Sequence, residues 1–444
     1  MNARKLVEQT FITPFLKKER RFVGCELEFP LISLTGEPLD TGIITPFLEY
    51  LLTNGFSVED TDIHGRGIFL INADGDCLSF DNSYNNFEFA MEKGENLIFI
   101  AERFYRLFAL VQNFLLSHGH TLCGLGTNPR FSVSDTLPVE YPIYRTIRGF
   151  LSGFSGNGYH NIPYFPAWLS SVQTHLDVPQ NMLPRALTVM AALDFARGLL
   201  FSNGLPLVGD ETFSKTICFR DYLWEKSGFG SLADNTGPVC GSFASCDDIV
   251  DMILKKSMFL KKEGNDYVAM PPVSVESYFD GGAPETDISS YLSFKNVEVT
   301  RRGTLEMRSD CAQPVGAAFA PPAFNVGIFT KLDAAEQALE RFFELLPEEI
   351  AKAPDRNAIL RRRVIYGETY FVDKDKISVF LEELVALSAQ GLKERGFGEE
   401  RLLTPLFERA KTLDCPAKMY RKRQNEGEGE LAILADFSNP EKVF

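Results

Sequence analysis

Residues 23–31 read VGCELEFPL, an apolar strand-like run interrupted by two carboxylates, Glu26 and Glu28. In an extended strand, successive side chains point to opposite faces. Both glutamates therefore share one face, and the apolar Leu27 and Phe29 share the other. Taken alone, such a strand is typical of a sheet with one solvated face. The rest of the sequence decides whether the two carboxylates belong to a surface or to a site.

The same alternation recurs in three more segments, each with one apolar face and one face of ion-binding groups. These groups are Glu88 in FEFA (87–90), Gln173, His175 and Asp177 in SVQTHLDV (171–178), and Glu306 and Arg308 in GTLEMRSD (303–310). If the strands are neighbours, their carboxylates repel one another unless cations neutralise them. Carboxylate ligands with one imidazole suit Mg²⁺ or Mn²⁺ better than Zn²⁺. The pattern predicts a divalent metal site on an open sheet face, with His175 either a ligand or a hydrogen-bonded strand histidine.

Hard metals held by carboxylates beside an arginine usually serve phosphate groups. The sequence contains no GxxxxGK[ST] loop. The glycines of LCGLGTNP (122–129) precede a proline and open no helical pattern, so they form no dinucleotide fingerprint. The residues by themselves therefore indicate a metal-dependent site, with a nucleotide as one candidate ligand.

Strand-like and helical segments are mixed along the 444 residues without a regular βαβ repeat. This arrangement predicts an α+β fold with a largely antiparallel sheet. We expect one catalytic domain, comprising an N-terminal helix (1–21), a mixed core with the site (22–325), a mainly helical part (326–420) and a polar tail (421–444). The segment 311–325 has the composition of a connection between the mixed and helical parts. Helical periodicity is found at 41–54, 94–118, 182–202, 245–261, 332–353 and 376–394.

Composition excludes several classes of protein. A net charge of -15 argues against a nucleic-acid partner. The eight cysteines form no CxxC pair, which excludes a zinc ribbon or a disulfide scaffold, predicts reduced thiols and leaves a regulatory disulfide open. The N-terminus lacks the apolar core of a secretory signal, and no apolar run is long enough to span a membrane. We therefore expect a cytoplasmic protein with no membrane partner.

Six motifs in order resemble glutamate-cysteine ligases of the plant and bacterial type, within the carboxylate-amine ligase group. The resemblance covers most of the chain, and it implies a glutamine synthetase-like fold. In that fold a curved, largely antiparallel sheet forms a funnel with helices on its outer face, and metal ions on its inner face hold ATP. The motifs are GCELEFPL (24–31), NNFEFAMEKGENL (85–97), CGLGTNPRF (123–131), SVQTHLDV (171–178), FSNGLP (201–206) with FRDYLWE (219–225), and VTRRGTLEMRSDCAQP (299–314).

The resemblance also implies a role for individual residues, with Mg²⁺ or Mn²⁺ as the cofactor and ATP as co-substrate. The implied metal ligands are Glu26, Glu28, Glu88, His175 and Glu306. The implied nucleotide contacts are Gln173, His175 and Arg308, and the implied catalytic residues are Arg308, Glu28 and Glu306. The implied contacts to the small-molecule substrates are Arg220, Arg302 and Arg145.

The activity that the resemblance implies is ATP-dependent formation of a γ-glutamyl amide between glutamate and cysteine through an acyl phosphate, a step of glutathione biosynthesis. Three alternatives remain: a ligase that joins glutamate or another carboxylate to a different amine, a nucleotide-binding pseudoenzyme, and a metallohydrolase. Departures from the family pattern concern the substrate region. NSYN (82–85) replaces an acidic glycine-rich loop and predicts the loss of its carboxylate, PIYRTI (142–147) retains only Arg145 of a basic segment, and VGAAFA (315–320) replaces a Trp-Arg-Arg stretch.

Overall fold

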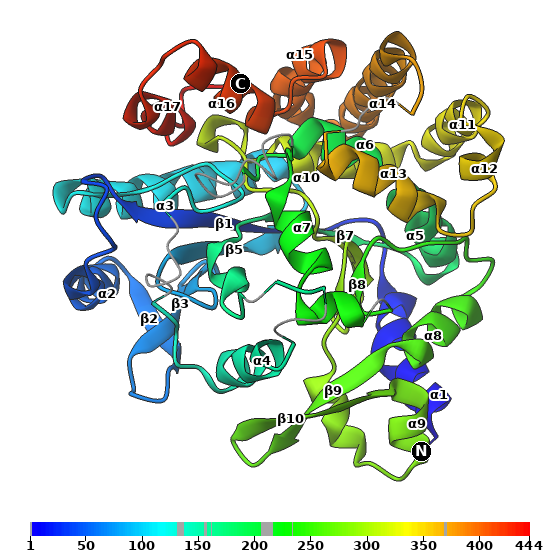
Figure 1. Cartoon of the computed structure of the whole chain (residues 1–444), viewed down its shortest axis with the longest axis horizontal. Coiled ribbons are helices and arrows are strands. Elements are labelled where there is room, and N and C mark those ends of the chain that lie inside the picture. Colours follow the sequence, from blue (N-terminus) through cyan, green and yellow to red (C-terminus); the bar gives the residue numbers. More distant parts are fainter. Residues whose placement is uncertain are drawn as a thin grey trace.

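The computed structural model describes residues 2–130, 137–154, 158–160, 162–205, 216–232, 234–367 and 371–444. A nine-stranded sheet crosses the centre of the molecule in the order β12-β13-β7-β1-β5-β4-β3-β2, and β6 pairs with the far end of β1 (Figure 1). Every strand pair of this sheet is antiparallel. The sheet is open, and the expected α+β class with a large antiparallel sheet is confirmed.

Two short strand pairs, β9 with β10 and β8 with β11, lie between β7 and β12 in the chain and outside the large sheet. The bounds of the large sheet are β1 (Val23–Ser33), β2 (Phe56–Thr61), β3 (Gly67–Asn72), β4 (Cys77–Phe80), β5 (Asn86–Gly94), β6 (His120–Leu122), β7 (Val172–Asp177), β12 (Val297–Val299) and β13 (Thr304–Met307). The bounds of the short pairs are β8 (Thr236–Gly237), β9 (Ser257–Glu263), β10 (Asp266–Ser274) and β11 (Phe294–Lys295).

Helices flank the sheet and make up most of the last third of the chain (Figure 1). Their bounds are α1 (Ala3–Val7), α2 (Ile44–Thr53), α3 (Leu97–Ser117), α4 (Pro142–Ser152), α5 (Leu183–Ala192), α6 (Asp194–Phe201), α7 (Phe219–Glu225), α8 (Cys246–Lys255), α9 (Val275–Asp280), α10 (Ala320–Thr330), α11 (Leu332–Phe343), α12 (Glu348–Ala351), α13 (Arg356–Ile365), α14 (Lys374–Arg395), α15 (Thr404–Thr412), α16 (Pro416–Asn425) and α17 (Glu430–Phe437).

The apolar face of the sheet packs against α3. Phe29 of β1 lies within ring-contact distance of Phe104 and Phe108 of α3, at 5.9 and 5.6 Å between centroids. Phe89 of β5 contacts the same two rings. Each of these four rings is essentially buried. The period-2 alternation of β1 and β5 thus supplies a core on one side, and this leaves their carboxylates on the other.

Four expected elements differ from the structure. The predicted helix 332–353 is interrupted between the end of α11 at Phe343 and the start of α12 at Glu348. The predicted helix 245–261 ends with α8 and continues as β9, because Ser257–Glu263 pairs with Asp266–Ser274. The predicted helix 182–202 is divided into α5 and α6 at Leu193. The segment 311–325, expected as a connection, includes the start of α10. This helix is buried on all sides from Ala320 to Phe329, so its sequence shows no amphipathic period. Two motif segments, 123–131 and 201–206, each end in a residue outside the described ranges.

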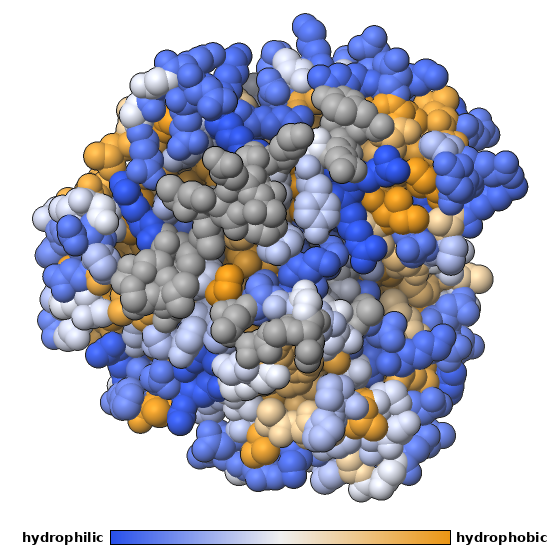
Figure 2. Space-filling view, viewed as in Figure 1, coloured by the Kyte–Doolittle hydropathy of each residue, from blue (hydrophilic) through white to orange (hydrophobic). Residues whose placement is uncertain are grey.

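The face of the molecule seen in Figure 2 is mainly hydrophilic, in keeping with the high net charge. Hydrophobic side chains gather at the upper right of this view, over the region of α11, α13 and α14. No helix in the described ranges has the length and apolar character needed to cross a membrane. All eight cysteines are free thiols.

We predict that Phe29→Ala lowers the free energy of unfolding by about 3–5 kcal/mol, because it leaves a cavity between β1 and α3. Urea denaturation followed by circular dichroism measures this loss. Phe99 lies on the outer side of α3 and is 63% exposed, so Phe99→Ala is the matched control. Its unfolding free energy should stay within about 0.5 kcal/mol of the wild-type value. Equal losses in the two variants would contradict this assignment of the core.

Candidate active site

Strand register gathers the polar side chains of the four motif strands onto one face of the sheet. Cα partners in an antiparallel pair carry their side chains on the same face. Glu28 of β1 lies opposite Glu88 of β5, and Glu26 lies opposite Gln173 of β7. Farther along the sheet, His175 of β7 lies opposite Glu306 of β13. The strands that carry these motifs were expected to be neighbours, and in the structure they are.

Three of these residues form a cluster with the geometry of a metal site. One ligand atom from each of Glu26, His175 and Glu306 lies within 4.8 Å of the other two. His175 Nε2 is 3.3 Å from a carboxylate oxygen of Glu26 and 3.8 Å from one of Glu306. The other ring nitrogen of His175 is 3.1 Å from the Thr304 hydroxyl, which fixes the ring so that Nε2 points at the carboxylates.

Gly24 makes room for this imidazole. It is the β1 partner of His175, and a Cβ atom at Gly24 would lie 3.3 Å from the Cβ of His175. The glycine in GCELEF therefore lets the histidine ring rest close over β1, next to Glu26. A larger side chain at this position would push the ring away from the two carboxylates.

A second acidic cluster lies beside the first. Burial, followed by the neighbouring charge of Asp81, raises the pKa of Glu28 to about 7, although Arg220, the Ser171 N–H and the Gln173 amide oppose the shift. Burial and the charges of Glu26, Asp81 and Glu28 raise the pKa of Glu88 well above its usual range. Burial also raises the pKa of Asp81. The protein's own cations therefore do not fully neutralise the negative charge of these three carboxylates.

Asp81 was missed by the sequence analysis, and it corrects one expectation. The replacement of the family's acidic loop by NSYN (82–85) predicted the loss of a carboxylate, but Asp81, the residue directly before this segment, brings one to Glu28 and Glu88. The signal was present in CLSFD (77–81), where Ser79 and Asp81 alternate with Leu78 and Phe80. Ser79 pairs with Glu88 across β4 and β5, and its hydroxyl donates to that carboxylate at 3.0 Å.

The carboxylate at the β12 edge of the row has a protein cation of its own. Glu298 of β12 lies opposite Glu306 and accepts two hydrogen bonds from the buried Lys256 ammonium, at 2.8 and 3.0 Å. At Glu26, burial would raise the pKa, but the charges of His175, Arg302 and Arg308 outweigh it and lower that pKa to about 2. Glu26 is therefore ionised, as a carboxylate ligand of a divalent metal ion must be.

The Gln173 side chain connects the two clusters. Its amide nitrogen donates to Glu28 at 2.9 Å, and a second carboxylate oxygen of Glu28 accepts from the Ser171 N–H at 2.8 Å. The amide oxygen of Gln173 is buried and has no hydrogen-bond partner in the described part of the chain. This oxygen is therefore available to a ligand on the polar face.

The four arginines predicted as site residues lie in different parts of the structure. The Arg308 side chain is 31% exposed, and it donates to Glu306 at 2.8 Å. Arg220 of α7 donates to the Arg308 carbonyl oxygen at 3.1 Å, so the two guanidinium groups belong to one region. Arg302 is 77% exposed on the turn between β12 and β13, 3.3 Å from Glu26. Arg145 of α4 pairs with Glu140 at 3.3 Å and contacts none of the other candidate residues.

One cavity opens onto the first cluster, and a second lies at Arg308, whose guanidinium is hydrogen-bonded to Glu306 of that cluster. The larger, of about 650 Å³, is lined by Glu26, His175 and Arg302 and by the lysines Lys17, Lys18 and Lys93. The other, of about 370 Å³, is lined by Arg220 and Arg308, by the aromatic side chains of Trp224 and Phe294, and by Asp234 and Lys295. The lysines were not among the residues predicted from the sequence. Lys17 and Lys18 precede β1, outside the strand pattern, and Lys93 lies near the end of β5.

This arrangement suits transfer of an anionic group between the cavities. The Glu306 carboxylate contacts both His175, which faces the larger cavity, and Arg308, which faces the smaller one. A polyanion in the lysine-lined cavity and an anion beside Arg308 would meet at this carboxylate. Preorganised cations at that point stabilise negative charge as it moves from one anion to the other.

Comparisons with known proteins agree with the fold. No protein-family model matches the chain. It is 24% identical over 310 residues to the chloroplastic glutamate-cysteine ligase of Solanum lycopersicum, and the match covers 66% of this chain and 56% of that protein. The chain therefore spans little more than half the length of this curated relative.

Two solved structures have the same fold over nearly the whole chain. One is glutamate-cysteine ligase from Francisella tularensis in complex with AMP, with a TM-score of 0.51, 12% identity and coverage of 96% of this chain and 90% of that one. The other is a bifunctional glutathione synthetase from Pasteurella multocida, with a TM-score of 0.53, 11% identity and coverage of 99% and 54%. The chain thus has the carboxylate-amine ligase fold, and it is similar to glutamate-cysteine ligases in both sequence and structure.

Proposed function

We propose that this protein is an ATP-dependent carbon-nitrogen ligase that joins the γ-carboxylate of glutamate to an amine, with cysteine as the first candidate. The observation that carries the proposal is the cluster of Glu26, His175 and Glu306 between a lysine-lined and an arginine-lined cavity. Similarity to glutamate-cysteine ligases in sequence and in fold supports the same reaction class.

ATP is assigned to the larger cavity. Its lysines suit a triphosphate, and Phe22 and Met91 offer apolar surface to a base. Lys18 is already held at this cavity by an ion pair with Asp177 at 2.9 Å. The AMP bound in the Francisella enzyme supports a nucleotide site in this fold.

Two metal positions follow from the two acidic clusters. Glu26, His175 and Glu306 would hold one ion, and Glu28, Glu88 and Asp81 would hold the other. Hard divalent ions supply charge neutralisation between carboxylates and phosphate oxygens. Mg²⁺ fits these oxygen-dominated donor sets better than zinc, which prefers cysteine and histidine.

The carboxylate substrate is assigned to the smaller cavity, beside Arg308 and Arg220. A carboxylate is a poor electrophile, and phosphorylation by ATP converts it into an acyl phosphate that an amine attacks. In this step Arg308 stabilises the transferred phosphoryl group, and Arg220 orients the anionic substrate. This route needs no covalent protein nucleophile, and burial raises the pKa of the Cys25 thiol.

An amine other than cysteine is the second candidate, and the wall of the smaller cavity favours it. Trp224 and Phe294 stack there with centroids 4.8 Å apart and an angle of 30° between the rings. This flat apolar surface suits an amine that carries a larger hydrophobic group. The polar end of the cavity at Arg308 is the same for both candidates.

We predict that the protein releases ADP and phosphate only when Mg²⁺, ATP, glutamate and an accepted amine are all present. A coupled ADP assay with a panel of amines, including cysteine and amines with aromatic groups, measures this. Stimulation by cysteine alone supports the first candidate, and stimulation by another amine selects the second. No ADP release with any amine identifies a pseudoenzyme, and hydrolysis of other substrates without ADP identifies a metallohydrolase.

We predict that Arg308→Ala and Asp81→Asn each reduce kcat by at least about 100-fold, because each removes a charge at the point of phosphoryl transfer. The melting temperature should show that both variants remain folded. Arg185 pairs with Asp333 and Glu336 on the surface, so Arg185→Ala is the matched arginine control with unchanged kcat. Wild-type activity in Arg308→Ala would refute the assigned site.

We predict that the metal-free protein loses stability as pH rises from about 4.5 through about 7. The Glu28 pKa is raised in the folded state, so folding favours the protonated carboxyl, and this contribution disappears above the folded pKa. In EDTA at pH 8, Glu28→Gln should therefore melt above the wild type, whereas at pH 5 the two should melt together. With Mg²⁺ at pH 8 the order should reverse, because only the wild type gains the full binding energy. A melting difference independent of pH would contradict the role of this carboxyl.

A further inference from the structure

One buried arginine of the helical C-terminal part, Arg361, lies at the smaller cavity, to which we assign the carboxylate substrate. Arg361 of α13 is only 1% exposed, although its guanidinium forms part of the wall of the smaller cavity. Helix α13 packs against α6 and α7, which carry other residues of that region. Neither the strand pattern nor the motif resemblance singled out this arginine.

All three nitrogens of the Arg361 guanidinium are engaged by the protein. Nε donates to the Asp221 carboxylate at 2.6 Å, one terminal nitrogen donates to the Asp194 carbonyl oxygen at 2.8 Å, and the other is 3.3 Å from the Ser309 carbonyl oxygen. Asp221 directly follows Arg220 in α7, and Ser309 directly follows Arg308 after β13. One planar group therefore joins α6, the start of α7 and the end of β13.

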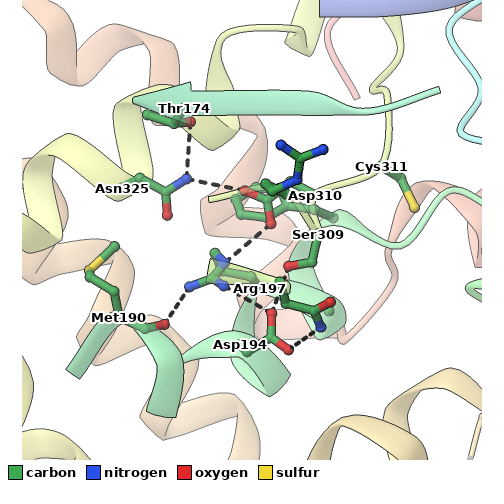
Figure 3. A network of polar contacts seen from close by, with 12 residues as sticks. Thr174, Met190, Asp194, Arg197, Ser309, Asp310, Cys311 and Asn325 are labelled. Atoms are coloured by element: carbon green, nitrogen blue, oxygen red, sulfur yellow. Dashed lines mark hydrogen bonds and ion pairs between the residues drawn. The ribbon is translucent and has the colours of Figure 1, made fainter. Parts of the chain in front are cut away.

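The partners of Arg361 are themselves fixed by a buried polar network (Figure 3). Asp194 accepts from Arg197 at 2.9 Å, from the Ser309 hydroxyl at 2.6 Å and from the Asn296 amide at 2.7 Å. Asp310 pairs with Arg197 at 3.3 Å. Since each of these groups is almost fully buried, the network costs free energy if any member moves away from its partner.

We infer that Arg361 is a positioning residue that sets Arg220 and Arg308 at the correct separation for the substrate carboxylate. This inference rests on the proposed function, because it concerns the same site. Arg361 does not contact the reacting atoms, since its nitrogens are used on Asp221, Asp194 and Ser309. Its planar fork matches three acceptors at once, which a lysine ammonium cannot do in the same geometry.

The glycine beside this guanidinium gives an independent way to move it. A Cβ atom at Gly198 of α6 would lie 2.5 Å from a terminal nitrogen of Arg361. Gly198→Ala therefore displaces the guanidinium and leaves its charge in place. The same change raises the intrinsic helix propensity of α6, so loss of activity could not be ascribed to a weaker helix.

The test compares Arg361→Lys and Gly198→Ala with a matched buried arginine. Arg409 of α15 is 2% exposed and donates to the Leu200 carbonyl oxygen and to Gln313, so Arg409→Lys makes the same chemical change away from both cavities. We expect Arg361→Lys and Gly198→Ala to lower kcat/KM for the carboxylate substrate by about 100-fold, as misplacement by about 1 Å does. The KM for ATP should stay at the wild-type value in all three variants, and kcat/KM of Arg409→Lys should stay close to wild type.

Each outcome of this experiment is decisive. A wild-type protein that releases no ADP with any substrate pair overturns the proposed function and this inference with it. An active wild type with losses in Arg361→Lys and Gly198→Ala no larger than in Arg409→Lys overturns the inference alone. A rise in the KM for ATP equal to the change for the carboxylate substrate also overturns it, because positioning acts on the arginine side only.

Discussion

The site depends on one constraint: carboxylates that share a buried sheet face can stay charged only beside cations. Glu28, Glu88 and Asp81 have raised pKa values because burial and mutual repulsion disfavour their charged forms. At the β12 edge of the row, Lys256 supplies a protein cation to Glu298. In the middle of the row, Glu26, His175 and Glu306 offer the donor set for the metal ion that we propose.

The sheet and the helices contribute to the site in different ways. The sheet provides the acidic row by register, because β7 lies between β1 and β13. The helices add cations to the smaller cavity, through Arg220 on α7 and Arg361 on α13. The ligase reaction we propose needs both, since an anionic carboxylate and a polyphosphate must approach each other. Hydrogen bonds to Asp194 of α6 from Ser309, which follows β13, and from Asn296, which precedes β12, connect the sheet with the helices.

The strand pattern predicted the fold class and much of the polar face, with clear failures elsewhere. Glu26, Glu28, Glu88 and Glu306 were found by period-2 alternation, since each strand exposes its chemistry in its own sequence. Asp81 follows the same alternation in CLSFD, directly before the NSYN segment from which the loss of a carboxylate was predicted. The helix predicted at 245–261 was wrong in its second half, because a hairpin with β10 overrides the local helical period.

The sequence by itself determined which side chains share a face of each strand, because alternation is a property of the extended backbone. It also determined, through ordered motifs, the resemblance to carboxylate-amine ligases. Only the tertiary structure decided which strands are neighbours, that Arg302 and Arg220 face different cavities, and that Arg145 lies apart from both. These facts depend on contacts between residues far apart in the chain, and no local periodicity encodes such contacts.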